Sequence, residues 1–285
     1  MPERRNESFL GLGLDGFHRI HYQEWGARND ANTLVCVHGL TRNSHDFDFL
    51  AAKLSEHYRV VCPDLAGRGE SDWLEDPKHY NLIQYNADMN ALIARLGCEQ
   101  VDWIGTSLGG LLGMILASMP RSPIRKLVIN DIGPYLPHAA LYRLGRYVGQ
   151  APDFEDFESA RAYLTEVYAP FGPLTEETWH RLVKNSIRQD DDGRYRLRYD
   201  PRIGDSFRKT ISVLHFSLWK YWDEVRCPVL IIRGKESDFL SRETAEEMCR
   251  RGDKVELVEI DGVGHTPMLS TIEEVTTIRD WLRSA

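Results

Sequence analysis

A serine between two glycines is the feature of this chain with the clearest chemical meaning. Ser107 lies in Gly105-Thr106-Ser107-Leu108-Gly109, after an apolar stretch predicted as a strand (100–104) and before one predicted as a helix (108–117). A strand-to-helix turn of this kind strains the backbone of the serine and lifts its hydroxyl clear at a helix N-terminus, where the helix dipole favours negative charge. The pentapeptide therefore predicts a nucleophile for acyl transfer.

A base and an acid must accompany such a serine. The hydroxyl is a weak nucleophile at neutral pH, so it needs a base, and the base needs a third group that fixes its tautomer. His265 follows the last predicted strand directly, and Asp238 follows the strand before it. Because the C-terminal ends of parallel strands meet at one edge of a sheet, both side chains can converge on Ser107.

The elements that must position these residues alternate between strand and helix. The N-terminus predicts a hairpin of two strands (7–14 and 17–25) joined by Asp15-Gly16. Further strands are expected at 33–37, 58–62, 100–104, 125–131, 228–232 and 255–260, with helices near 44–57, 82–96, 108–117, 241–251 and 270–282. This order predicts an α/β fold with a mostly parallel central sheet and helices on both faces.

The alternation breaks after Pro134. Residues 135–222 become aromatic, charged and helical in period, with a hairpin expected near 190–193. We expect a core of residues 1–134 and 223–285 and an inserted, mainly helical cap of residues 135–222. Part of the cap's aromatic set, which includes Phe216 and Trp219, is expected to line an apolar pocket.

Taken together, these motifs resemble those of the α/β-hydrolase superfamily, in its serine-nucleophile, esterase- and lipase-like branch with a cap. The resemblance covers essentially the whole chain and rests on the elbow at Ser107, on His38-Gly39, on the glycine-rich segment 64–72 and on Gly264-His265. It implies that Ser107 is the nucleophile, that His265 is the general base and then the general acid, and that Asp238 orients the histidine. It also implies an oxyanion hole formed by the backbone N–H groups of Leu40 and Leu108.

The resemblance leaves the acid open. Many family members carry it one residue nearer to the glycine of the strand, where this chain has Ser237. Other members take it from the end of the strand before the cap, which is Asp131 in this chain. Asp238 is the first expectation, Asp131 the alternative, and Glu236 a minor candidate.

The substrate is predicted only in character. His38, Gly39, Arg68 and Trp219 are candidates for the substrate pocket, with His38 also expected to shape the oxyanion loop. Relatives that open epoxides or displace halide attack through a carboxylate, so a serine at this position excludes their chemistry. We expect hydrolysis of short-to-medium acyl, aryl or oligomeric carboxylic esters. The alternatives are a lactonase or carbon–carbon hydrolase of aromatic catabolism, and a ligand-sensing receptor on the same fold.

Composition restricts the classes of molecule that this chain is expected to bind. A net charge of −8 without a basic run argues against nucleic acid or an anionic membrane surface and favours a small-molecule substrate. The five cysteines are scattered, with no CxxC pair and no histidine at metal-ligand spacing, so we expect no metal and no cofactor. No secretory signal or bilayer-length apolar segment is seen, which predicts a cytoplasmic protein. The oligomeric state stays open.

Overall fold

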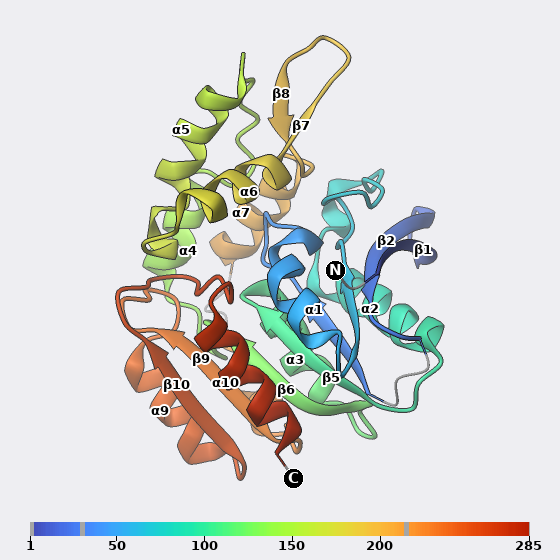
Figure 1. Ribbon diagram of the computed structural model, residues 1–285, viewed down its shortest axis with the longest axis vertical. Helices are drawn as coiled ribbons and strands as arrows, with labels where there is room; N and C mark the ends of the chain where they lie inside the picture. The colour runs from blue at the N-terminus through green and yellow to red at the C-terminus, as the bar shows by residue number, and fades with distance from the viewer. Residues whose placement is uncertain (1–2, 29–31, 214–216, 285) are drawn as a thin grey trace.

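The structure is a computed structural model that describes residues 3–28, 32–213 and 217–284, without the side chains of residues 210–213. Eight strands form one sheet in the order β1-β2-β4-β3-β5-β6-β9-β10 (Figure 1). The strands are β1 (Arg4–Gly13), β2 (Gly16–Trp25), β3 (Thr33–Val37), β4 (Arg59–Pro63), β5 (Val101–Thr106), β6 (Ile124–Asn130), β9 (Val229–Gly234) and β10 (Val255–Ile260). The pairs β1–β2 and β2–β4 are antiparallel, and the pairs from β4 to β10 are parallel. The predicted mostly parallel sheet with an N-terminal hairpin is confirmed.

Helices cover both faces of this sheet. On one face lie α1 (Asp48–Leu54) and α10 (Ile272–Arg283), and on the other lie α2 (Leu82–Leu96), α3 (Leu108–Ala117) and α9 (Arg242–Arg251). Strand β3 shows why two layers form, since Leu34 and Cys36 pack toward the first face while Val35 and Val37 pack toward the second. Because β3 is buried on both sides, its sequence is a continuous apolar run and does not alternate with polar residues.

The segment between β6 and β9 lies over the C-terminal edge of the parallel strands (Figure 1). It has its own apolar cluster, in which Phe154, Leu164 and Leu182 are buried. Its elements are α4 (His138–Gly145), α5 (Phe157–Val167), η3 (Ala169–Phe171), α6 (Glu176–Ser186), β7 (Ile187–Gln189), β8 (Tyr195–Leu197), α7 (Ile203–Val213) and α8 (Trp219–Trp222). The mainly helical insertion and its hairpin are as expected, and residues 135–222 stay the predicted extent of the cap. Phe216 lies outside the described residues.

Polar contacts join this cap to the core. Arg42 donates from Nη1 to Ser186 Oγ at 2.5 Å, and Asn43 donates from Nδ2 to the Asn185 carbonyl at 2.7 Å. Near α2, the Tyr80 hydroxyl donates to the buried carboxylate of Asp200 at 2.6 Å. These bonds hold the C-terminal end of α6 and the segment before α7 against loops of the core.

The predicted helix over 44–57 is shorter than expected. It divides into a 3₁₀ turn, η1 (Ser44–Phe47), and α1, which ends at Leu54. The side chain of Asn43 caps the first turn by accepting from the His45 N–H at 3.2 Å. A second 3₁₀ turn, η2 (Pro77–His79), precedes α2.

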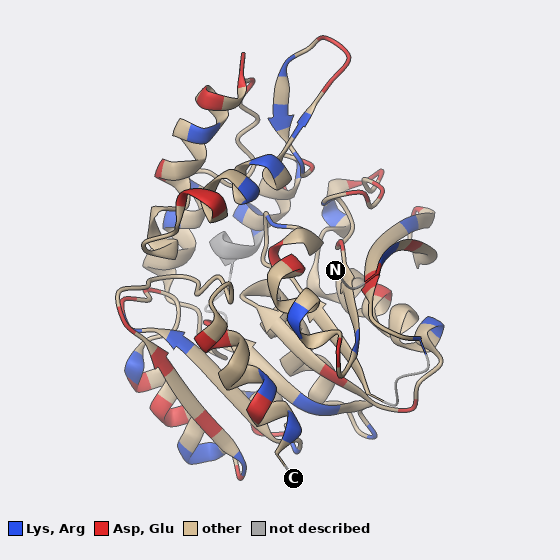
Figure 2. Ribbon diagram, viewed as in Figure 1, with Lys and Arg blue, Asp and Glu red and all other residues tan. Residues whose placement is uncertain are grey.

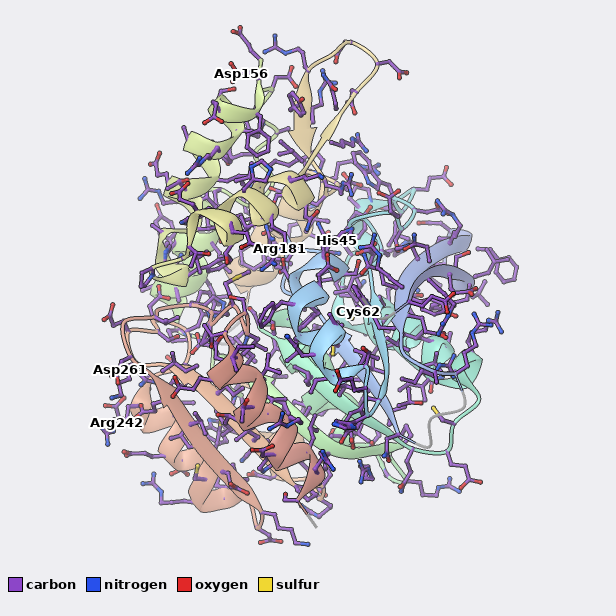
Figure 3. The ribbon with its side chains drawn as sticks, in the orientation of Figure 1. His45, Cys62, Asp156, Arg181, Arg242 and Asp261 are labelled. Carbon is purple, nitrogen blue, oxygen red and sulfur yellow. The ribbon has the colours of Figure 1, made fainter. Side chains whose placement is uncertain are left out.

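Charged side chains gather on the outside of the cap. Figure 2 shows basic and acidic residues along β7 and β8 and the turn that joins them, where Arg196 pairs with Asp153, Asp190 and Asp192. Figure 3 shows Asp156 at the outer end of the cap, and Cys62 in the interior of the sheet layer. Asp153, Asp190 and Asp192 are therefore part of a surface ion-pair network.

Candidate active site

Ser107 occupies a strained turn between β5 and α3. Its backbone has φ 50° and ψ −111°, a region that costs free energy for any residue with a Cβ. A Cβ on Gly105 would overlap the carbonyl of Gly109, and a Cβ on Gly109 would overlap the carbonyl of Val37. Strand and helix approach this closely only because both positions are glycine.

His265 joins Ser107 to a buried carboxylate. The Ser107 Oγ and the His265 Nε2 are 3.0 Å apart, and the His265 Nδ1 lies 2.7 Å from Oδ2 of Asp131. His265 is 8% exposed and Asp131 is 0% exposed. Because an ionised carboxylate only accepts, Nδ1 carries the proton and Nε2 is left to accept from the serine hydroxyl.

Asp131 is held by hydrogen bonds on both carboxylate oxygens. It follows β6 at φ 56°, and its Oδ1 accepts from the Gly234 N–H at 2.9 Å. Its Oδ2 accepts from the Ser237 hydroxyl at 2.6 Å as well as from His265. A fully buried carboxylate is costly unless its oxygens are bonded, and here three donors bond them.

Asp238 has a different position, and the expectation for the acid needs correction. Its side chain is 44% exposed and forms a bidentate ion pair with Arg143 of α4, with Nε to Oδ2 at 2.7 Å and Nη2 to Oδ1 at 2.8 Å. In the loop after β9, Ser237 turns inward to Asp131 and the next residue turns outward to the cap. Glu236 is exposed. The alternative acid, Asp131, is therefore the carboxylate that contacts the histidine.

Two backbone N–H groups lie beside Ser107. Leu108 is the first residue of α3, where N–H groups have no partner within the helix. Leu40 lies next to Gly39, and a Cβ on Gly39 would be 3.7 Å from the Cβ of Ser107. Leu40, Leu108 and Ser107 line the same cavity. Both predicted oxyanion donors are thus near the nucleophile.

His38 holds the loop that carries Leu40. Its Nε2 accepts from the Leu65 N–H at 3.0 Å, so Nδ1 carries the proton and donates to the Gly39 carbonyl at 2.7 Å. That carbonyl belongs to the same peptide group as the Leu40 N–H. Complete burial lowers the pKa of His38 to about 4, so the ring stays neutral at physiological pH.

The pocket predictions are met only at Gly39. Arg68 is fully buried and braces a loop, donating from Nε to the Leu40 carbonyl at 2.8 Å and from Nη1 to the Tyr85 hydroxyl at 2.7 Å. Trp219 lies under the guanidinium of Arg251, 4.4 Å from the Arg251 Cζ to the ring centroid. Within the described part of the chain, the cavities at Ser107 are lined by Gly39 but not by His38, Arg68 or Trp219.

Two cavities of different character meet at Ser107. The larger measures about 320 Å³ and is mainly apolar. Besides Ser107, it is lined by Leu40, Tyr80, Asn81, Leu82, Ile83, Tyr85, Leu108, Leu111, Ile132, Leu136, Leu141, Leu144, Ile203, Phe207 and Phe239. The smaller measures about 50 Å³, and its lining includes His265 and the polar side chains of Thr41, Arg42, Asp46 and Tyr168.

Sequence reasoning missed most of these lining residues. Leu141 and Leu144 are spaced i and i+3 on α4, so an apolar face of this helix could have been read from the sequence. Arg42 and Tyr168, whose guanidinium and ring are 4.8 Å apart, come from segments far apart in the chain, and nothing local indicates that they meet.

The described residues show neither a metal-binding cluster nor a membrane-spanning helix. Across residues 3–28, 32–213 and 217–284, no three His, Cys, Asp or Glu side chains are grouped so that they could hold a metal ion. In the same part of the chain, no helix combines the length and apolar character needed to cross a bilayer. All five cysteines are free thiols.

Residues 34–277 match the sequence model of the alpha/beta hydrolase family, and the chain belongs to this family. A 3-hydroxybutyrate-oligomer hydrolase from Cupriavidus necator is 47% identical over 88% of each chain. An esterase from Mycobacterium tuberculosis is 30% identical over 84% of this chain and 78% of its own. A solved alpha/beta hydrolase from Novosphingobium aromaticivorans is 35% identical, covers 99% of both chains and has a TM-score of 0.90. The predicted fold class is confirmed, and the relatives place this chain among the hydrolases.

Proposed function

We propose that this protein is a serine carboxylic ester hydrolase in which Ser107, His265 and Asp131 form the catalytic triad. The observation that carries the proposal is the continuous hydrogen-bonded line from the Ser107 Oγ through both ring nitrogens of His265 to Asp131. His265 takes the proton of Ser107 as the oxygen attacks the ester carbonyl, and Asp131 stabilises the resulting imidazolium. The backbone N–H groups of Leu40 and Leu108 are assigned to the oxyanion of the tetrahedral intermediate.

The second half of the cycle uses the same groups. Collapse of the intermediate breaks the bond to the leaving alcohol, which receives its proton from His265, and the acyl group remains on Ser107. Water then attacks the acyl-enzyme with His265 again as base, and the carboxylic acid leaves as Ser107 regains its proton. Every proton is returned, so the net reaction is ester plus water giving acid plus alcohol.

The position of His265 assigns the leaving alcohol to the smaller cavity. The alcohol oxygen must come within hydrogen-bond reach of His265, and His265 lines the smaller cavity while the larger one extends from Ser107 along apolar side chains. We therefore assign the acyl group to the cavity of about 320 Å³ and the alcohol to the cavity of about 50 Å³. This arrangement favours an apolar acyl group and a small, polar alcohol.

Oligomeric esters of short hydroxy acids are the substrate class we propose. Cleavage inside such an oligomer releases an alcohol that carries a carboxyl or ester group close to its hydroxyl, and Thr41, Arg42 and Tyr168 offer polar groups around that half. The relative that is 47% identical over most of both chains is named for 3-hydroxybutyrate oligomers, which supports the same class.

The test compares Ser107→Ala with Ser118→Ala, a serine at the other end of α3 whose hydroxyl bonds to the Ile115 carbonyl. The substrates are 3-hydroxybutyrate dimer and trimer, p-nitrophenyl esters of graded acyl length, and lactones. Ser107→Ala should abolish turnover and fluorophosphonate labelling with an unchanged circular dichroism spectrum, and Ser118→Ala should keep both. Activity of Ser107→Ala near the parent level would disprove the mechanism.

The panel also separates an esterase from a lactonase and from a ligand-sensing receptor. Faster turnover of lactones than of every linear ester would identify a lactonase. Turnover of a simple ester above about 1 s⁻¹ is in the usual range for enzymes and would reject a ligand-sensing receptor. No hydrolysis of the oligomers by a protein that hydrolyses p-nitrophenyl esters would remove the support for hydroxy-acid substrates.

A further inference from the structure

Three consecutive residues after β9 contact three different parts of the site. Ser237 donates to Asp131 at 2.6 Å, Asp238 pairs with Arg143 of the cap, and the Phe239 ring stacks on the His265 ring with centroids 4.2 Å apart. One short turn therefore contacts the acid, the base and the cap together.

This turn is stiff at its centre. The Ser237 Oγ accepts from the backbone N–H groups of Phe239 and Leu240, at 3.2 and 3.1 Å, while its proton goes to Asp131. Arg233, which is buried, donates from Nε to the Leu240 carbonyl at 2.7 Å and fixes the far end. A displacement of Asp238 therefore displaces Ser237 and Phe239 as well.

The cap helix at the other end of this contact also forms the substrate cavity. Leu141 and Leu144 of α4 line the larger cavity, and Arg143 lies between them in sequence and turns to the core. The Arg143 Cζ is also 5.7 Å from the centroid of the Phe239 ring. The helix that the acyl group would touch is therefore tied directly to the turn that packs on His265.

We propose that Arg143 and the turn Ser237-Asp238-Phe239 are positioning residues, which hold His265 and Asp131 in line with Ser107 when cap helix α4 is docked. This inference rests on the proposed function. Asp238 and Arg143 touch neither the reacting atoms nor the two cavities at Ser107, so they act through Phe239 and Ser237. Undocking of α4 releases the turn and loosens the histidine.

The test breaks the pair from each side, with Arg143→Gln and Asp238→Asn, and restores it in reverse with Arg143→Asp combined with Asp238→Arg. Small misplacements of a base are costly, so each single variant should lower kcat by about tenfold with little change in KM. The rate of Ser107 labelling by a small fluorophosphonate should fall by the same factor, and the charge-reversed pair should recover most of both losses.

A matched ion pair elsewhere provides the control. Asp223 pairs with Arg251 at 3.0 and 3.1 Å, with side-chain exposures of 47% and 39% against 44% and 33% for Asp238 and Arg143. Arg251 also lies over an aromatic ring, that of Trp219. Asp223→Asn removes a comparable half-exposed pair that lies outside the turn 237–239, so it should leave kcat and the labelling rate within about twofold.

Two results would overturn the proposal. Parent-level kcat and labelling in Asp238→Asn and Arg143→Gln would show that the cap contact does not reach the histidine. A rise in KM alone would show that the pair only guides substrate. If the parent labels but hydrolyses no ester, the proposed function fails, while the labelling rates of the variants still decide whether the turn positions the base.

Discussion

Asp131 and Asp238 follow neighbouring strands of one sheet and have opposite surroundings. Asp131, after β6, is fully buried and accepts from His265, Ser237 and the Gly234 N–H. Asp238, after β9, is 44% exposed and pairs with Arg143 of the cap. Both lie at the correct edge of the sheet for an orienting acid. The difference shows that the order of the strands determines which loop carries a residue. A shift of one position within that loop then determines whether the side chain reaches the site, as at Ser237, or the surface, as at Asp238.

Burial also suits Asp131 to the proposed chemistry. Interactions between charges strengthen where water is excluded, so a buried carboxylate stabilises an imidazolium more strongly than an exposed one does. The pair between Asp238 and Arg143 is half-exposed and therefore screened. In the proposed mechanism, a carboxylate therefore orients the base at one position and docks the cap at the other.

The largest expected effect comes from exchanging the acid itself. Asp131→Asn should lower kcat by about ten-thousandfold, because an amide can donate to Nδ1 of His265 and favour the tautomer that cannot accept from Ser107. Asp238→Asn should cost only about tenfold, the loss expected from poorer positioning of the histidine. Steady-state kinetics on one p-nitrophenyl ester compare the two. The reverse ranking, with both variants folded, would return the acid to Asp238.

Moving the acid should recover part of that loss. The Ser237 Oγ is 2.6 Å from Oδ2 of Asp131, so a carboxylate at position 237 can occupy nearly the same place. Adding Ser237→Asp to Asp131→Ser should raise kcat about a hundredfold over Asp131→Ser alone, since it restores an orienting charge.

The control for that exchange is Ser237→Asn in the same Asp131→Ser background. It has the size of the aspartate without the charge, and it should leave kcat at the level of Asp131→Ser. Equal recovery with Asn and Asp would mean that shape, and not an ionised acid, limits the reaction.

Much of the fold could be predicted because its signals are local. The alternation of apolar segments gave the sheet and its helices, and Gly105 and Gly109 predicted the elbow because a close strand-to-helix contact excludes any Cβ. His265 could be placed because it lies in the loop after β10, the last strand of a parallel sheet.

The acid and the pocket depended on contacts that no local pattern contains. Ser237 and Asp238 are adjacent, so only the turn geometry decides which of them faces Asp131 and the catalytic site. Arg68 carries a charge and was expected at the pocket, but it is fully buried, and its Nε and Nη1 donate to the Leu40 carbonyl and the Tyr85 hydroxyl. The cavity walls come from cap helices whose docking on the core is a long-range property.

The histidines also differ in burial, and the buried His38 predicts that the stability of the protein depends on pH. Burial lowers the pKa of His38 from 6.5 to about 4, so between these values the unfolded chain binds a proton that the folded chain does not. The stability that neutral His38 contributes is therefore complete above pH 6.5 and is lost as the pH falls toward 4. Between pH 8 and pH 5, this single group should reduce the free energy of unfolding by about 2 kcal/mol.

Urea unfolding at both pH values measures that loss. His38→Asn keeps a donor for the Gly39 carbonyl but does not titrate. Between pH 8 and pH 5, the free energy of unfolding of this variant should therefore decrease by about 2 kcal/mol less than that of the parent. His57 is exposed, and His57→Asn should follow the parent. Equal falls in the parent and in His38→Asn would show that His38 is not held neutral.

The smallest expected effect concerns the hydroxyl of Ser237, which bonds to Asp131 and precedes Asp238 in the sequence. Ser237→Ala removes the donor to Asp131 and leaves the N–H groups of Phe239 and Leu240 without their acceptor. Loss of such bonds typically costs about 1 kcal/mol, so kcat should fall about fivefold and the midpoint of urea unfolding should fall slightly. Ser237→Thr keeps the hydroxyl and should retain parent kinetics. If alanine and threonine behave alike, the hydroxyl has no part in holding Asp131, and the difference between the two carboxylates comes from burial alone.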